Sequence, residues 1–237
     1  MILPPLGTRD VGATEEMDDP GCDPQRLART YASFRTVNAL VAGWRSTYRH
    51  VLRPHLRREG VNTLLDVGCG GGDISRALAR WARGDGFTLS VTGIDPDPRA
   101  HAWASRQPPV DGVRYRRVRS EELVSEGARF DLVVSNHLLH HLDADQLQGL
   151  LDDSERLARH AAVHSDIQRG RLAYSLFSAG TWPFFRGSFI REDGLTSIRR
   201  SYTASELREQ VPPRWDVRTR GKFRLLLTLD PRSITPP

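Results

Sequence analysis

Hydrophobic residues between positions 61 and 167 fall into short apolar runs separated by segments with helical spacing. The runs have the length of buried strands. The segments between them keep the i, i+3, i+4 spacing of amphipathic helices, as at Ile74, Ala77 and Leu78. Alternating strands and helices predict an α/β fold with a mainly parallel sheet. The expected strands are residues 64–67, 89–95, 113–118, 130–136 and 161–167.

The residues before the first strand predict an arm followed by helices. Residues 1–22 carry Pro, Gly and an acidic cluster, which is typical of a loosely held arm. Asp23 and Pro24 are start signals for a first helix, and a second helix is expected to end near Pro54. Residues 23–60 are therefore expected to form N-terminal helices.

After the fifth strand the regular alternation loosens. Residues 167–202 form an aromatic-rich insertion, and Thr203-Ala-Ser-Glu206 matches a capping box that opens a helix. Residues 215–220 and 223–229 have the pattern of two strands joined by a tight turn. A closing hairpin of this kind predicts a doubly wound sheet with an antiparallel edge. The segment 203–237 would then supply the C-terminal helix and hairpin.

The composition of the chain is typical of a single globular domain. At 237 residues with 38% hydrophobic and 27% charged residues, positions 23–237 are expected to form a single domain. No run approaches the roughly 20 apolar residues of a membrane span, and Met1–Gly7 shows no secretory signal. Cys22 and Cys69 suggest neither a zinc site nor a disulfide framework. A reducing cytoplasm is the expected location.

The net charge of +5 does not by itself indicate a nucleic-acid partner. The basic residues are scattered, and the tightest group lies within residues 114–119. A nucleic-acid binder should show a coherent basic face interleaved with aromatic residues. A solvated charge run is favoured, so nucleic acid is not an expected partner.

A glycine-rich turn follows the first strand in the sequence Asp66-Val-Gly68-Cys-Gly70-Gly-Gly72. Glycine lets a ligand approach bare backbone, and the helix that follows offers unpaired N–H groups. The spacing differs from that of a pyrophosphate-binding turn, and Asp66 would repel a diphosphate but attract an ammonium group. Asp95, after the second strand, is placed to accept both hydroxyls of a ribose. A ribose joined to a cationic amino acid describes S-adenosylmethionine.

On Asp66-Val-Gly68-Cys-Gly70-Gly-Gly72 and Asp95, the chain resembles the class I S-adenosylmethionine-dependent methyltransferases. The resemblance covers residues 61–166, the expected cofactor-binding core, and implies a Rossmann-like sheet of seven strands with an antiparallel C-terminal hairpin. It implies S-adenosylmethionine as the cofactor. The cofactor contacts it implies are Asp66, Gly68, Cys69, Gly70, Gly72, Asp95, Pro96, Asn136 and His137.

The adenine contact departs from the family pattern. Many members place an acidic residue near the end of the third strand. Here the nearest matches are Arg119 and Ser120, with Glu121 just beyond. These three residues are the expected adenine contacts, although the departure leaves that contact open.

His140 and His141 follow the fourth strand, where family members that act on quinones, phenols and other small molecules commonly show His-His-Leu. A phenol with a pKa near 10 benefits from a base, and histidine suits that work. Consecutive helical residues point about 100° apart, so at most one is expected to face the acceptor. A cofactor-side or packing role is the alternative. Asp166 is a second-choice polar group, although a surface acid is the favoured interpretation of it. The 137–141 segment alone offers too little chelation geometry, so no metal is expected.

The N-terminal helices and the insertion 167–202 are expected to form a lid over the substrate. Their aromatic side chains suit a flat or apolar small molecule. Packing of the same side chains against the sheet is the alternative. The candidate substrate contacts are Tyr31, Trp44, Tyr48, Tyr174, Phe177, Trp182 and Phe185.

The favoured function is methyl transfer to the oxygen, or to carbon, of a phenolic, quinone or polyketide-like compound. The likeness is to the ubiquinone- and menaquinone-type branch and to secondary-metabolism enzymes. An RNA or protein methyltransferase is the alternative, although Ser135-Asn136-His137-Leu138 lacks the Asn-Pro-Pro-Tyr type of motif used on amino groups. A non-catalytic cofactor-binding partner is a further possibility, and the glycine spacing disfavours a nicotinamide oxidoreductase. The sequence leaves the oligomeric state open.

Overall fold

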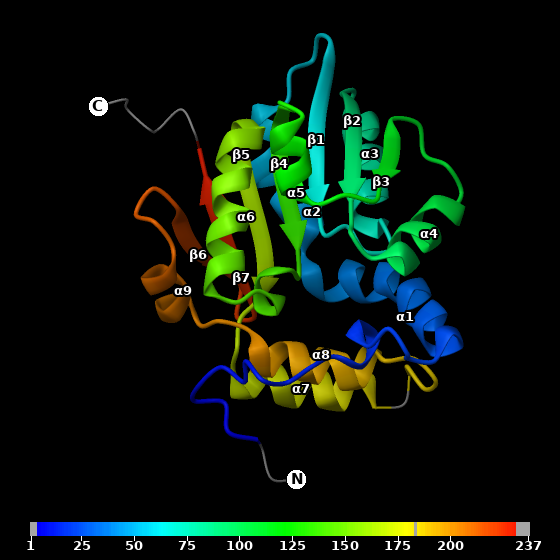
Figure 1. Cartoon of the computed structure of the whole chain (residues 1–237), viewed down its shortest axis with the longest axis vertical. Helices are drawn as coiled ribbons and strands as arrows, with labels where there is room; N and C mark the ends of the chain where they lie inside the picture. Colours follow the sequence, from blue (N-terminus) through cyan, green and yellow to red (C-terminus); the bar gives the residue numbers. More distant parts are fainter. Residues whose placement is uncertain (1–3, 183, 231–237) are drawn as a thin grey trace.

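A sheet of seven strands in the order β3-β2-β1-β4-β5-β7-β6 forms the centre of the computed structural model, which describes residues 4–182 and 184–230 (Figure 1). Strands β1 to β5 pair in parallel, and β7 runs antiparallel to both of its neighbours. This confirms the predicted doubly wound sheet with an antiparallel C-terminal hairpin. The strands are β1 (Val61–Val67), β2 (Thr88–Ile94), β3 (Val113–Arg116), β4 (Phe130–Asn136), β5 (Ala158–Ile167), β6 (Asp216–Arg220) and β7 (Arg224–Leu229).

The strand order reverses direction between β1 and β4. Val67, the last residue of β1, pairs with Ile94 of β2 and with Ser135 of β4. The glycine turn, Asp95 and Asn136 therefore meet at the same edge of the sheet. Ligands of open α/β sheets bind in the crevice outside such a reversal point.

Alternation along the strands builds a core on each face of the sheet. Leu64 packs in one buried cluster with Leu78 of α3, whereas Leu65 packs in the other with Leu147 of α6. The helices that follow the first strand are α3 (Asp73–Gly84), α4 (Pro98–Arg106), α5 (Ser120–Ser125), η5 (Leu139–His141), α6 (Ala144–Leu157), α7 (Arg171–Thr181), α8 (Ile190–Arg200) and α9 (Ala204–Gln210).

The N-terminal helical region is more broken than the sequence predicts. Helix α1 (Pro24–Val37) begins as expected, because the Asp23 carboxylate accepts hydrogen bonds from the N–H groups of Gln25 and Arg26. The expected second helix is divided, and Gly43 before it has a φ of 54°, with the Arg224 guanidinium in the space that a Cβ would need. The pieces are η2 (Asn38–Ala42), α2 (Trp44–Thr47), η3 (Tyr48–Leu52) and η4 (Arg53–His55).

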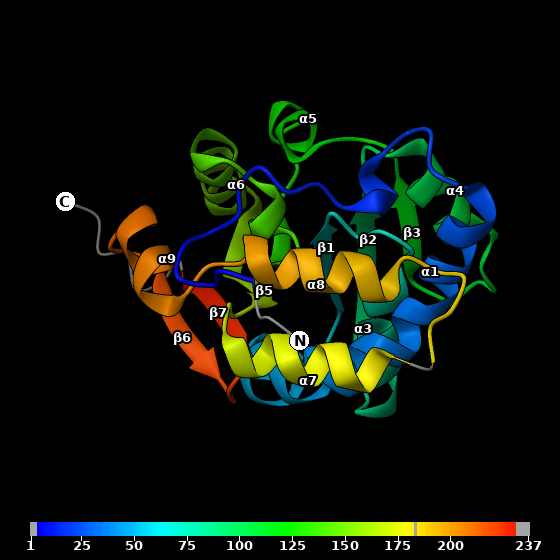
Figure 2. The same ribbon diagram turned by 90° about the horizontal axis from the view of Figure 1, so that it is seen from below.

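The insertion 167–202 is largely helical. Helices α7 and α8 lie side by side beneath the carboxyl edge of the sheet (Figure 2). They form a third layer with α1, and a small cluster of Leu27, Tyr31, Ala100 and Phe189 joins α1 to α4 and to the start of α8. This layer covers the ends of the strands where the glycine turn lies.

The N-terminal arm is held far more firmly than the sequence predicts. The buried Arg169 guanidinium donates hydrogen bonds to the carbonyls of Leu6 and Gly7, and Arg9 lies over the Tyr202 ring. The arm then runs along α8 to η1 (Glu16–Asp18), as Figures 1 and 2 show. The prediction of a loosely held arm was wrong for residues 4–22, because the groups that hold them lie near the other end of the chain.

Within residues 4–182 and 184–230, no helix combines the length and the apolar character needed to cross a bilayer.

His164 of β5 gives the fold a pH dependence that can be measured. Its ring nitrogens lie 2.8 Å from the Ser135 hydroxyl and 3.2 Å from the Ser154 hydroxyl, and burial lowers its pKa from 6.5 to about 3. The unfolded chain therefore binds a proton near pH 6.5 that the folded chain does not, so stability falls as the pH drops from 6.5 towards 3.

We expect His164→Gln to remove this dependence. Between pH 7 and pH 5 the wild type should lose about 2 kcal/mol more unfolding free energy than the variant. Urea unfolding at the two pH values measures the difference, and parallel losses in both proteins would show that His164 does not carry it.

Candidate functional site

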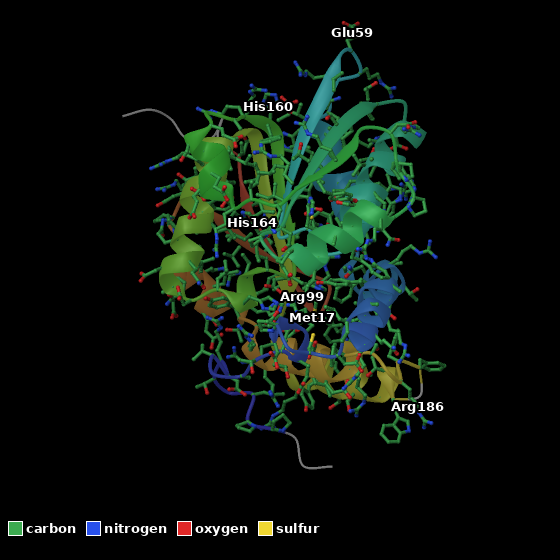
Figure 3. All side chains as sticks on the ribbon, turned by 45° about the vertical axis from the view of Figure 1, so that its right-hand side comes forward. Met17, Glu59, Arg99, His160, His164 and Arg186 are labelled. Carbon is green, nitrogen blue, oxygen red and sulfur yellow. The ribbon has the colours of Figure 1, made fainter. Side chains whose placement is uncertain are left out.

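A cavity of about 770 Å³ lies between the carboxyl edge of the sheet and the layer of α1, α7 and α8. The glycine turn and the ends of β2 and β4 form its floor. The arm contributes Glu15 and Met17 to the opposite side, and Figure 3 shows Met17 close to Arg99 below the sheet. The cofactor-binding core, the N-terminal helices and the insertion 167–202 thus all contribute to one cavity, as does the arm.

The glycine turn presents its backbone to this cavity. Gly70 has a φ of 51°, nothing occupies the space beside its Cα, and its N–H donates a 2.9 Å hydrogen bond to Asp95. Gly72 has a φ of 71°, and a Cβ there would collide with the Tyr115 phenol. Gly72 does not line the cavity, so it shapes the turn while Gly68, Cys69 and Gly70 face the ligand space.

Asp66 lies buried under the turn. Its carboxylate accepts a 2.5 Å hydrogen bond from the Ser75 hydroxyl, and it lines the cavity. Burial raises the pKa of Asp66 to about 7, even though the Ser75 bond opposes the change. A cationic group placed in the cavity would restore the charged form, because opposite charges attract strongly where water is excluded.

Asp95 lines the cavity where the sequence predicts it. One carboxylate oxygen accepts from the Gly70 N–H and the other from the Asp97 N–H, which fixes the orientation of the group. Burial raises its pKa. Each oxygen keeps a further lone pair, so the carboxylate can still accept from two hydroxyl groups.

Asn136, the last residue of β4, and His137 after it line the cavity. The Trp44 indole N–H donates a 2.7 Å hydrogen bond to the Asn136 side-chain oxygen, which fixes that amide. His137 has a φ of 53°, a left-handed conformation that costs energy for a residue with a Cβ. Burial lowers its pKa to about 4, so its ring is neutral near pH 7.

His140 lies in a buried row of charged groups. Its Nδ1 is 2.7 Å from Asp166 and its Nε2 is 3.2 Å from Glu15. Burial alone would lower the pKa of His140, but the two carboxylates outweigh burial and raise it to about 10. The two carboxylates therefore favour the charged form of the ring, which disfavours His140 as a general base.

Glu15 approaches His141 as well. His141 Nε2 is 3.7 Å from the same Glu15 oxygen, and the two histidine rings lie 4.3 Å apart between centroids. Burial would raise the pKa of Glu15, but the two histidines and the Ser197 hydroxyl hold it at about 2. Both histidines line the cavity.

Some predicted site residues lie elsewhere. Arg119, Ser120 and Glu121 do not line the cavity, because β3 ends at Arg116 and Ser120 donates to Asp153. The structure thus places the expected adenine contacts outside the site.

The predicted substrate contacts divide in two. Tyr31, Phe177 and Phe185 line the cavity. Trp44 and Tyr48 are buried in the core under the sheet and do not reach the cavity. Tyr174 and the largely exposed Trp182 also lie outside it.

Several lining residues were missed by the sequence. The apolar wall includes Phe34, Leu176 and Ile190, and the polar side includes Glu15 and Asp193. The hydrophobic stripe of α1 was a signal for Phe34. No local pattern marks Glu15, because its partners lie after β4 and in α8.

Comparison with known sequences agrees with this geometry. Residues 64–161 match the model described as a methyltransferase domain. A ubiquinone biosynthesis O-methyltransferase of Methylobacterium sp. (strain 4-46) is 33% identical over 150 residues, which are 59% of this chain and 55% of that protein. One of Rhizobium leguminosarum bv. trifolii (strain WSM2304) is 37% identical over 81 residues, 33% of this chain and 30% of that protein. The chain thus spans about half the length of these relatives, or less.

Solved structures share the fold at low sequence identity. Human N-acetylserotonin methyltransferase with bound SAM has a TM-score of 0.61 and 12% identity, over 95% of this chain and 65% of that one. The DszA carbon methyltransferase has a TM-score of 0.56 and 18% identity, over 92% and 61%. The plantazolicin methyltransferase BpumL with SAH has a TM-score of 0.54 and 10% identity, over 86% and 95%. These likenesses show the shared fold.

Asp66 provides a test of the cofactor site. The pKa of Asp66 is 3.8 in the unfolded chain and about 7 in the folded one. Its contribution to stability is therefore greatest below pH 3.8 and is lost as the pH rises through about 7. We expect Asp66→Asn to melt about 5 °C above the wild type at pH 8, and by less at pH 5.

The same substitution should weaken binding of S-adenosylmethionine about tenfold, because the ammonium group loses a charged partner. Thermal unfolding and calorimetric titration measure the two effects. A variant that binds the cofactor like the wild type would remove Asp66 from the cofactor site.

Proposed function

We propose that this chain, a member of the class I S-adenosylmethionine-dependent methyltransferases, transfers a methyl group to an oxygen of an apolar, phenolic small molecule. The observation that carries the proposal is one continuous cavity whose floor is polar and whose wall is apolar. Asp66, Gly70 and Asp95 lie on the floor, and Phe177 and Ile190 lie on the wall. A volume of about 770 Å³ is enough for a cofactor beside a small acceptor.

The floor fits the cofactor in three ways. Asp66 offers a carboxylate to its ammonium group, Asp95 to its ribose hydroxyls, and the open face of Gly70 allows close backbone approach. When bound, S-adenosylmethionine supplies an electrophilic methyl group on a positively charged sulfur. The chain's task is then to hold the acceptor in line with that group, which turns a bimolecular reaction into a local one.

The acceptor's oxygen binds at the histidine end of the cavity. His140 and His141 line the cavity there, and a ring N–H group can donate a hydrogen bond to an acceptor oxygen. In this arrangement they position the acceptor. The name of the curated relatives, ubiquinone biosynthesis O-methyltransferase, supports a phenolic acceptor. Quinone-derived and polyketide-like phenols, including those of secondary metabolism, share this chemistry.

A macromolecular acceptor is the weaker proposal. The arm and the helices α7 and α8 cover the cavity, and Glu15 of the arm lies beside its histidines. A protein or RNA segment would have to displace them, whereas a small molecule fits the volume of the cavity.

Asp95 tests the cofactor assignment directly. We expect Asp95→Ala to weaken S-adenosylmethionine binding about 100-fold, because two hydrogen bonds to a charged acceptor are lost. Asp111→Ala removes an exposed carboxylate outside the cavity and should leave the affinity unchanged. Calorimetric titration compares the three proteins, and wild-type affinity in Asp95→Ala would contradict the ribose assignment.

Phe177 tests the acceptor wall. For an alkyl-substituted phenol that is turned over, Phe177→Ala should raise KM about tenfold, since the acceptor loses an apolar partner worth about 1.5 kcal/mol. The control Leu172→Ala lies on the exposed side of the same helix and should not change KM. Steady-state kinetics with saturating cofactor make the comparison, and equal KM values in all three proteins would place the acceptor elsewhere.

A further inference from the structure

We propose that Glu15, His140 and His141 form a binding site for one divalent transition-metal ion at the histidine end of the cavity. Each residue offers one ligand atom, and the three atoms lie within 4.8 Å of one another. Two imidazoles and one carboxylate are a donor set that zinc and similar ions accept in catalytic sites. The residues come from the arm and from η5, which is why the sequence, with its histidines alone, predicted no metal.

The distances between the donor atoms are close to those of a metal site. The Glu15 oxygen is 3.2 Å from His140 Nε2 and 3.7 Å from His141 Nε2. Two ligands bound tetrahedrally at about 2.0–2.1 Å lie roughly 3.4 Å apart. An ion between these atoms therefore requires only small movements of the side chains.

In each histidine a neighbouring carboxylate faces Nδ1, the ring nitrogen that is not the proposed metal ligand. His140 Nδ1 is 2.7 Å from Asp166, and His141 Nδ1 is 3.2 Å from Asp18. In metal sites such carboxylates fix the ring orientation and make the opposite nitrogen a better ligand. Here the arrangement occurs twice, and it turns both Nε2 atoms towards Glu15.

The buried Nε2 atom of His140 has no hydrogen-bond partner of good geometry in the described structure. Its side chain is only 1% exposed, and Glu15 lies at ion-pair distance without the alignment of a hydrogen bond. A buried polar atom without a partner costs free energy. A bound ion satisfies this atom, and a charged histidine between two carboxylates is the competing arrangement.

The arm is anchored so that Glu15 stays in place. Asp193 of α8 accepts hydrogen bonds from the N–H groups of Glu16 and Met17 at 2.7 and 3.1 Å. The Ser197 hydroxyl donates a 2.7 Å hydrogen bond to the Glu15 oxygen that faces the histidines. Docking of the arm on α8 thus completes the ligand set.

Three protein ligands leave a tetrahedral ion one open position. All three residues line the cavity, so that position is reached from the acceptor space. An acceptor hydroxyl bound there would lose its proton to water more readily, because the ion stabilises the ionised oxygen. This role of the open position rests on the proposed function, whereas the binding of the ion does not.

The test is titration of the untagged, metal-stripped full chain with Zn²⁺ by calorimetry, and with Co²⁺ by visible absorption. We expect one ion per chain and the absorption bands of a four-coordinate cobalt site. Glu15→Gln and His141→Asn should each weaken Zn²⁺ binding at least tenfold. Asp18→Asn changes a half-exposed residue that pairs with His141 and, at 3.8 Å, with Arg200, and it should weaken Zn²⁺ binding roughly tenfold.

Glu16→Gln and His50→Asn, both exposed and outside the three ligands, are the matched controls and should bind like the wild type. Thermal unfolding checks that each variant is folded. If a variant of a buried residue does not fold, the half-exposed Asp18→Asn still tests the site. Failure to bind Zn²⁺ or Co²⁺, or equal binding in Glu15→Gln and His141→Asn, would overturn the proposal. A separate titration of the metal-stripped chain with S-adenosylmethionine tests the proposed function. Cofactor binding without metal binding would overturn the metal site alone.

Discussion

The buried contact of Glu15 with His140 ties the parts of the site together. It joins the arm to η5 after β4, and Asp166 extends it to the end of β5. All three side chains are nearly inaccessible to water, so each charge depends on its neighbours for stabilisation. A carboxylate buried alone would have a raised pKa, yet the pKa values of Glu15 and Asp166 are both held at about 2 by the histidines. The arm is therefore part of the folded site.

The sheet supplies a second constraint, which is the reversal of strand order between β1 and β4. Parallel pairing brings the ends of β1, β2 and β4 to one edge, and each end carries a polar group facing the cavity. The cofactor floor follows from this topology. The apolar wall of the cavity has a different origin, because residues outside the alternating core must hold α1, α7 and α8 across the edge of the sheet.

Local patterns in the sequence mark the residues that form the floor of the cavity. The glycine turn, Asp66 and Asp95 are each marked by residue type and by position relative to a strand end, and their spacing survives in the structure. The capping box at Thr203 and the closing hairpin were equally local, and the structure confirms both.

The acceptor end was much harder to predict. Glu15 meets residues more than a hundred positions away, and no short pattern reveals such a contact. The aromatic residues of the insertion show the same limit, because helical phase decides which of them face inward. Phe177 lines the cavity, whereas Trp182 is 65% exposed. The residues expected to contact adenine lie outside the cavity lining for a related reason, since β3 ends at Arg116, before them.

The central claim is methyl transfer from S-adenosylmethionine to an apolar phenol in this cavity. The most direct measurement follows a radiolabelled methyl group from the cofactor in the presence of a panel of alkyl-substituted phenols and catechols. We predict that label moves to the organic extract only when both the chain and a phenol are present. Label that appears in protein or RNA, or that reaches no phenol although the cofactor binds, would contradict the account.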